Sequence, residues 1–295
     1  MQVFGTCDPG SNPGGAIFIF NMKPKKIIIY GQAKSGSTAL YYKIKNSINE
    51  NCFCLFEPEE KELKNLNEIK KTVLIKSLDG KLRHYFKNFD KKILITRDPR
   101  DRIISSLLYI GGYHKSREQE EQDNIKILEQ KESYPGSISL IELFKNLYSI
   151  SEEEIIDYWK SYLDHILNFK RKNKDCFIIK YEDLIKNDIK ELEEYLGFKL
   201  VKEVKIDKNL SRVIRTKSSG SWRNWLTKED IRLLKPIVKE YMQEFNYDFD
   251  DWKLNNPQTI NPEHCSHYFK RVLKEKKKYR NIRALLSKVR GIVKR

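Results

Sequence analysis

The stretch "YGQAKSGSTALYYKI", residues 30–44, decides the fold of this chain. It follows the apolar run "KKIII" at 25–29, so a strand-like segment leads into a Gly/Ser/Lys loop and then into a helix-like segment. Such a loop presents backbone N–H groups to an anion at the start of the helix. Gly31 and Gly36 have the spacing of a triphosphate-binding loop, but Ser37 stands where that loop has its lysine, and Lys34 lies two residues before Gly36. We therefore predict a phosphate loop that holds something other than the end of a triphosphate.

The rest of the chain alternates strand-like and helix-like segments, which predicts an α/β fold. The strands are apolar without clean alternation, as expected of a sheet covered on both faces; they are Lys26–Tyr30, Val73–Lys76, Lys92–Thr96 and Cys176–Lys180. Capping boxes open two helices, at Ser151…Glu154 and Thr227…Asp230. We expect a single domain with a central, mostly parallel sheet flanked by helices, and ligands at the carboxyl ends of its strands. The highly polar segment 115–135 is expected to be an exposed insertion or a mobile lid.

Charge is unevenly distributed along the 295 residues. The net charge is +16, and residues 268–295 alone hold twelve Lys/Arg against one acid, which favours an anionic partner but says nothing about the fold. We expect a loose extension at 1–24, a compact domain at 25–267 and a basic amphipathic tail at 268–295. Two interpretations of the tail stay open: packing on the domain, or peripheral contact with an anionic membrane or polyanion. Its apolar face consists of Ile282, Leu285, Leu286, Val289, Ile292 and Val293.

The sequence predicts neither a membrane span nor a disulfide framework. The longest apolar runs are strand-sized, well short of the roughly 18 residues of a spanning helix. The five cysteines have neither the spacing of a disulfide framework nor that of a zinc site. We therefore expect no metal, and a cytoplasmic location is the default.

Two further stretches place cations and hydroxyls near strand ends. In "ILITRDPRDRIISSLLY" (93–109), Arg97 ends a strand and Ser105 lies two turns into the next helix, so both can bind one phosphate. A capped helix start with surface ion pairs is the alternative there. In "VIRTKSSGSWRNW" (213–225), a basic hydroxyl loop precedes two tryptophans and either folds over an anion or is an exposed linker. The junction "IKYEDL" (179–184) is interpreted as scaffold.

Taken together and in order, these four stretches resemble the sulfotransferases that use 3′-phosphoadenosine 5′-phosphosulfate (PAPS). "KSGST" resembles the family's 5′-phosphosulfate loop, and the eight-residue separation of Arg97 and Ser105 is that of its 3′-phosphate motif. "IKYEDL" is similar to a recurrent strand–helix junction, and "RTKSSGSWRN" resembles the loop that closes over the cofactor. The resemblance covers residues from about 26 to 245. It implies a sulfotransferase topology like that of P-loop proteins, and transfer of a sulfuryl group from PAPS to an acceptor hydroxyl without a metal.

The resemblance also implies a set of site residues. The cofactor-binding candidates are Lys34, Ser35, Gly36, Ser37, Thr38, Arg97, Ser105, Arg215, Lys217, Ser218, Ser219 and Gly220. The closing loop departs from the family, because Thr216 and Lys217 stand where a lysine and a glycine are common. Ala39 stands where many members have tryptophan.

The resemblance leaves the catalytic base less certain than the cofactor site. "LIKSLDGKL" (74–82) lacks the histidine of the cytosolic branch, whereas branches acting on glycans and protein tyrosines use a glutamate. Glu57 occupies roughly that place and is the candidate base beside the catalytic Lys34, although "EPEEKEL" also fits a solvated helix start. Asp79 and His84 are weaker candidates, and His114 is a candidate for the acceptor cleft.

Two other functions stay open on the sequence alone. A P-loop kinase acting on a small molecule would share the fold, but it needs a lysine after Gly36. A basic nucleic-acid-binding module would explain the charge, but no specific nucleic-acid motif is present. Within the sulfotransferase interpretation, a glycan, protein tyrosine, lipid or small alcohol all remain as acceptors.

Overall fold

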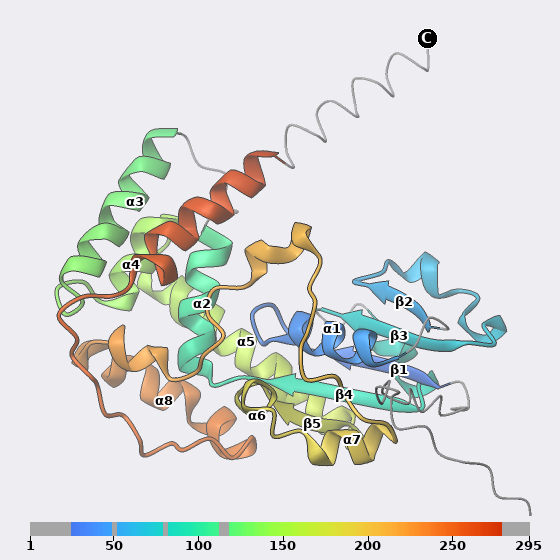
Figure 1. Cartoon of the computed structure of the whole chain (residues 1–295). Helices are drawn as coiled ribbons and strands as arrows, with labels where there is room; N and C mark the ends of the chain where they lie inside the picture. The colour runs from blue at the N-terminus through green and yellow to red at the C-terminus, as the bar shows by residue number, and fades with distance from the viewer. Residues whose placement is uncertain (1–24, 49–51, 79–81, 112–117, 279–295) are drawn as a thin grey trace, which may run out of the picture.

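A five-stranded parallel sheet forms the centre of the molecule in the computed structural model, which describes residues 25–48, 52–78, 82–111 and 118–278. The strand order is β2-β3-β1-β4-β5. The carboxyl ends of the strands point toward the helices α2 (Pro99–Gly111) and α4 (Leu140–Tyr148) (Figure 1). The strands are β1 (Lys26–Tyr30), β2 (Cys52–Phe56), β3 (Thr72–Ser77), β4 (Lys91–Thr96) and β5 (Phe177–Lys180). The expected α/β class with a parallel sheet is confirmed.

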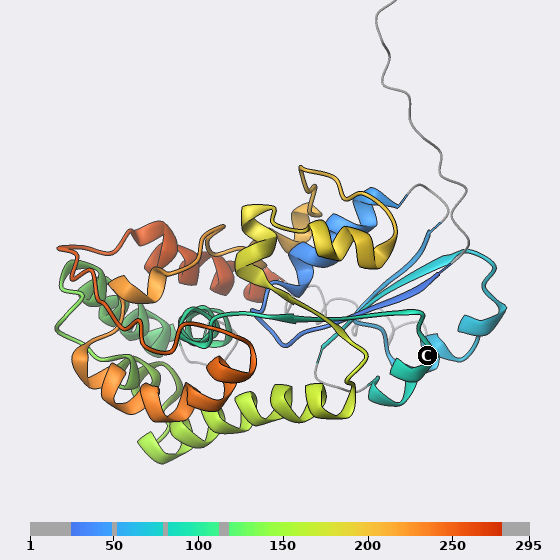
Figure 2. The same cartoon turned by 90° about the horizontal axis from the view of Figure 1, so that it is seen from below.

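Successive residues of β1 point to opposite faces of the sheet, and both faces are covered. Ile27 and Ile29 pack with α1 (Ser37–Ser47), α6 (Tyr181–Lys186) and α7 (Lys190–Leu196). Ile28 and Tyr30 pack with α5 (Glu152–Lys172) and α8 (Lys228–Glu244). Figure 2 shows α1 and α7 on one side of the sheet and α5 on the other. This double cover explains why the strand sequences lack polar alternation.

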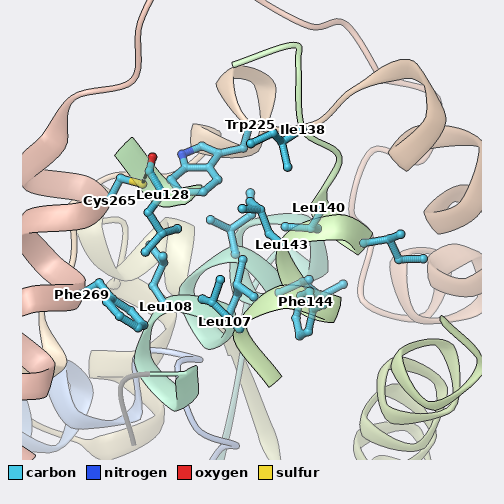
Figure 3. Close-up of a cluster of buried hydrophobic side chains, with 14 of the residues drawn as sticks. Leu107, Leu108, Leu128, Ile138, Leu140, Leu143, Phe144, Trp225, Cys265 and Phe269 are labelled. Atoms are coloured by element: carbon cyan, nitrogen blue, oxygen red, sulfur yellow. Dashed lines mark hydrogen bonds between the residues drawn. The ribbon is translucent and has the colours of Figure 1, made fainter. Parts of the chain in front are cut away.

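Further helices form a second body beyond the carboxyl ends of the strands. They are α2 (Pro99–Gly111), α3 (Glu118–Ser133), α4 (Leu140–Tyr148) and a helix over 266–278. Their shared core includes Leu108 of α2, Leu128 of α3 and Phe269 of the last helix (Figure 3). Short 3₁₀ segments lie at Glu60–Leu63, Leu66–Glu68, Arg83–Asn88, Lys208–Val213, Ser221–Asn224 and Pro262–His264.

The segment 115–135, expected to be an exposed insertion or a mobile lid, forms in its described part a helix with one exposed and one buried face. Residues from Glu118 to Ser133 form α3, and both Leu128 and Lys131 are fully buried. Lys131 Nζ donates to the carbonyls of Pro135 and Ile138. The polar composition was misleading because it hid one buried face of α3, where Lys131 and Glu132 lie, whereas polar residues of the other face, such as Asp123 and Lys126, are exposed.

Both predicted capping boxes are present, at Ser151 and Glu154 and at Thr227 and Asp230. Asp98 caps α2 through the bond from Arg100 N to Asp98 Oδ1, at 2.9 Å. These local signals fix where the helices begin.

The packed core extends past residue 267, where the sequence placed the end of the domain. Tyr268, Phe269 and Val272 have no exposed surface, so the first part of the predicted tail packs on the domain. Residues 1–24 and 279–295, with the apolar face from Ile282 to Val293, lie outside the described residues. Among the residues described, none of the helices has the length and apolar character needed to cross a membrane.

Candidate active site

The loop between β1 and α1 has the backbone geometry that an anion site requires. Gly36 has φ of +95°, and a Cβ there would collide with the ring of Tyr181. Lys34 also has a positive φ, +70°, a conformation that is costly for a residue with a side chain. No side chain caps α1, so the first N–H groups of this helix are available to an anion in the way phosphate loops use them. Ser37 and Thr38 begin this helix.

The side chain of Lys34 turns inward from the loop. Lys34 remains partly exposed as a residue, but its ammonium is enclosed. Nζ donates to the carbonyl of Val213 at 2.7 Å and to the hydroxyl of Tyr268 at 3.0 Å. Burial holds the pKa of Lys34 well below its usual value, and the charges of Arg97, Arg215 and Arg212 lower it further.

Arg97, at the end of β4, lies against this loop. Its Nη1 donates to the carbonyl of Lys34 at 3.1 Å, and its guanidinium stacks on the ring of Tyr181, 4.5 Å from the centroid. Only 6% of Arg97 is exposed, and its Nε has no hydrogen-bond partner among the described residues. Ser105 is buried in α2, two turns after Arg97.

Arg215 is the third cation of the cluster. It is 6% exposed and donates from Nη2 to Ser221 Oγ at 2.9 Å and from Nη1 to the carbonyl of His264 at 3.3 Å. Burial, followed by the charge of Arg97, lowers the pKa of Arg215 to about 10. The structure thus brings together Lys34, Arg97 and Arg215, which the sequence singled out on three separate stretches.

The loop at 213–225 is anchored to α2 by Asp101, which sequence reasoning missed. Asp101 has no exposed surface and accepts from Gly220 N at 2.5 Å, Ser221 Oγ at 2.8 Å and Trp222 N at 2.9 Å. Lys217 and Ser218, before this anchor, are exposed, and Ser219 is half-buried. The only sequence signal was the second acid of "RDPRD", a stretch for which surface ion pairs were one alternative. That alternative of surface ion pairs is wrong, because Asp98 and Arg100 form a buried ion pair at 2.7 Å.

The junction "IKYEDL" connects the site elements without projecting chemistry of its own. Tyr181 carries Arg97 on its ring and donates from its hydroxyl to the carbonyl of Thr216 at 3.3 Å. Glu182 accepts from Asp98 N and from the Tyr247 hydroxyl, both at 3.1 Å. Burial raises the pKa of Glu182. These contacts are those of a scaffold.

Glu57 lies at the carboxyl end of β2, two strands from β1. It has φ of +53°, and its carboxylate pairs with the ammonium of Lys76, a buried residue of β3. Glu57 therefore pairs with Lys76 and not with Lys34. After Asp101, Lys76 is the second residue near the site that sequence reasoning missed. Glu57 sits before, not inside, the first 3₁₀ turn, Glu60–Leu63. Asp79 and His114 lie outside the described residues, as does the side chain of His84.

A family comparison assigns the chain. The sulfotransferase domain matches residues 24–208, which include the phosphate loop, the Arg97–Ser105 motif and the "IKYEDL" junction. The chain belongs to the sulfotransferase family. This sulfotransferase is accordingly a transferase, and its loop at 213–225 lies beyond the matched residues. Among the described residues of this sulfotransferase, no group of three His, Cys, Asp or Glu side chains is arranged to hold a metal ion.

Solved structures give more distant similarity to this sulfotransferase. Mouse sulfotransferase SULT7A1 complexed with PAP is 18% identical with a TM-score of 0.47, covering 74% of this chain and 85% of that chain. Retinol dehydratase in complex with retinol and PAP is 16% identical with a TM-score of 0.39, covering 74% and 82%. No curated protein matches this sulfotransferase in a sequence search.

Proposed function

We propose that this sulfotransferase transfers a sulfuryl group from PAPS to an acceptor hydroxyl. The observation that supports this donor is the cluster of Lys34, Arg97 and Arg215 at one edge of the sheet. Arg97 Nε, Arg215 Nε and Ser35 Oγ are buried without hydrogen-bond partners among the described residues. Burying several cations whose N–H donors lack acceptors costs free energy unless an anion pairs with them. A nucleotide with anionic groups at both the 5′ and 3′ ends fits this donor set.

The two ends of the nucleotide fall to different elements in this proposal. The 5′ end is assigned to the phosphate loop, Lys34, Ser35, Gly36, Ser37 and Thr38. The 3′ phosphate is assigned to Arg97 and Ser105, with the loop of Arg215, Lys217, Ser218, Ser219 and Gly220 closing over the nucleotide. The bond from Arg97 Nη1 to the Lys34 carbonyl supports this division, because it joins the two halves directly.

The chemistry requires a proton acceptor and a stabiliser of charge. PAPS supplies the activated sulfuryl group. Glu57 Oε accepts the proton of the acceptor hydroxyl, a role worth about 10²–10⁴-fold in rate. The Lys76 ammonium holds the Glu57 carboxylate in place. The ammonium of Lys34 and the N–H groups at the start of α1 stabilise the negative charge that develops at the 5′ end, roughly 3 kcal/mol for each donor.

Isothermal titration with three ligands tests the proposal. Adenosine 3′,5′-bisphosphate (PAP), ATP and a single-stranded DNA are titrated with and without magnesium. Tight binding of the bisphosphate that does not depend on magnesium is expected. Magnesium-dependent ATP binding with no bisphosphate binding would instead favour the kinase, and preferred DNA binding would favour the nucleic-acid module.

The acceptor and the location of the enzyme follow from separate experiments. A panel of glycans, tyrosyl peptides, lipids and small alcohols with ³⁵S-labelled PAPS identifies the hydroxyl that is sulfated. We propose a cytoplasmic enzyme, which cell fractionation tests. Vesicle sedimentation with and without residues 279–295 tests peripheral membrane contact of the basic tail.

A further inference from the structure

The helix over 266–278 is fixed to the helical body. Phe269 packs with Leu108 and Leu128, and Cys265 Sγ lies 3.7 Å from the carbonyl of Leu128 (Figure 3). The main chain is bound to α3 as well, because Ser266 N donates to Glu132 Oε1 at 2.6 Å. Two ion pairs at 2.7 Å, Lys270 with Glu129 and Lys277 with Glu121, continue this contact along α3. The helix therefore has a defined position relative to α2 and α3.

The same segment also binds the start of the closing loop. Arg271 Nη2 donates to the carbonyl of Ile214 at 3.2 Å, and Arg215 Nη1 donates to the carbonyl of His264 at 3.3 Å. Arg271 lies over the ring of Tyr268, 5.3 Å from the centroid. Residues 213–215 are thus held by the segment that carries Tyr268.

The ammonium of Lys34 ends between these two segments. It donates to Val213 O at 2.7 Å and Tyr268 Oη at 3.0 Å, and lies 4.1 Å from the centroid of the Tyr109 ring. A lysine ammonium has three N–H donors. Two are therefore directed by the closing loop and the last helix. In the proposed function the third donates to the nucleotide.

We propose that Tyr268 is a positioning residue for Lys34, and that the helix over 266–278 is thereby a working part of the active site. This inference rests on the proposed role of Lys34 at the 5′ end of the nucleotide. The hydroxyl of Tyr268 accepts from the ammonium and fixes the direction of its remaining N–H. It also favours the charged form of a lysine whose pKa is lowered by burial.

The Tyr268 hydroxyl has a titration signature that packing alone would not produce. The groups that face the Lys34 ammonium are Arg97 after β4, Arg212 and Arg215 before and in the closing loop, Tyr109 of α2 and Tyr268. The arginines lower the pKa of Lys34, whereas an accepting hydroxyl opposes that shift. Removing the hydroxyl therefore lowers the pKa further. Because the charged form is the active one, activity is then lost at a lower pH as pH rises.

The test compares Tyr268→Phe with Tyr195→Phe in the full chain. Tyr195 is a matched control, since its hydroxyl also bonds to protein, at Lys92 N and O, but outside the site. The pH titration of Lys34 is followed by NMR with labelled lysine, the signal being assigned by its loss in Lys34→Ala. Loss of a hydrogen bond to a charged group predicts a midpoint about 1 unit lower in Tyr268→Phe. An unchanged midpoint, or an equal shift in Tyr195→Phe, overturns the inference.

A replacement variant and a binding measurement distinguish a failed fold and a failed function from a failure of the inference about Tyr268. If Tyr268→Phe does not fold, 4-fluorophenylalanine is placed at 268 by amber suppression; its fluorine fills the place of the hydroxyl, cannot ionise and is a poor acceptor, so the midpoint should shift in the same direction, and no shift contradicts the proposal. Titration of the wild-type chain with PAP tests the function independently. A chain that binds no bisphosphate refutes the proposed function, while the Lys34 midpoint still decides whether Tyr268 acts on that lysine.

Discussion

At the scale of single residues, the site depends on a few side chains held in strained or buried positions. Lys34 and Glu57 both have positive φ, at +70° and +53°. Such conformations persist only where the surroundings enforce them, and they concentrate at functional sites. Both side chains contact a buried residue: Lys34 contacts Tyr268, and Glu57 contacts Lys76.

Lys34→Ala is expected to reduce sulfuryl transfer by at least about 10²-fold, because it removes a donor that stabilises developing charge. The measurement is turnover of ³⁵S-labelled PAPS with an accepting alcohol, together with the thermal midpoint of unfolding. Lys190→Ala, at an exposed lysine of α7, is the control. Near-normal turnover of Lys34→Ala would remove this lysine from the mechanism.

Glu57→Gln is expected to lower turnover by about 10²–10⁴-fold, because an amide cannot accept the proton. Binding of the bisphosphate, measured by calorimetry, should be unchanged. Glu60→Gln, three residues further along the chain and exposed, should keep full turnover. A fully active Glu57→Gln would show that the base lies elsewhere.

The sequence singled out the three cations that the structure brings together, but not the residues that hold the surrounding segments in place. Lys34, Arg97 and Arg215 stand in local motifs with characteristic spacing, so each could be found from its neighbours. Asp101 is 119 to 121 residues from the groups it binds, and Tyr268 is 234 residues from Lys34. Contacts at such separations are set by the tertiary fold, and no local pattern marks them.

At the scale of elements, the sheet was largely predictable and one helix was not. The strands β1, β3, β4 and β5 follow apolar runs within one residue of their expected ends. Their order in the sheet and the core position of α3 depend on packing between distant segments. The loop at 213–225 was also only partly predictable: its composition left open an anion-binding loop or an exposed linker, and its anchor on α2 is seen only in the structure.

Asp101→Ala is expected to release the closing loop from α2. The N–H groups of Gly220 and Trp222 would lose their acceptor in a buried place, at roughly 1–3 kcal/mol for each unsatisfied group. We expect a lower urea midpoint and weaker binding of the bisphosphate. Asp183→Ala, outside the described contacts of this loop, is the control. Unchanged affinity in Asp101→Ala would mean that the loop does not depend on this anchor.

At the scale of the whole molecule, the last described helix joins the two bodies. Tyr268, Phe269 and Val272 are fully buried, and each such side chain contributes about 1.5–3 kcal/mol on burial. Deleting residues 268–295 should therefore remove much of a typical domain stability of about 5–15 kcal/mol. Deleting only 279–295 keeps every described residue and is the matched control. Circular dichroism melting of both truncations checks this, and equal melting of the two would contradict it.

The contact between Tyr268 and Lys34 also has a consequence for biosynthesis. Lys34 of the phosphate loop is translated first, and Tyr268, whose hydroxyl binds the Lys34 ammonium, is translated 234 residues later. A nascent chain interrupted between residues 225 and 268 would contain all the nucleotide-binding motifs of the sequence and still lack the tyrosine that binds the Lys34 ammonium. If Tyr268 positions Lys34 as proposed, we expect competence for transfer only once residue 268 has been translated and has left the ribosome.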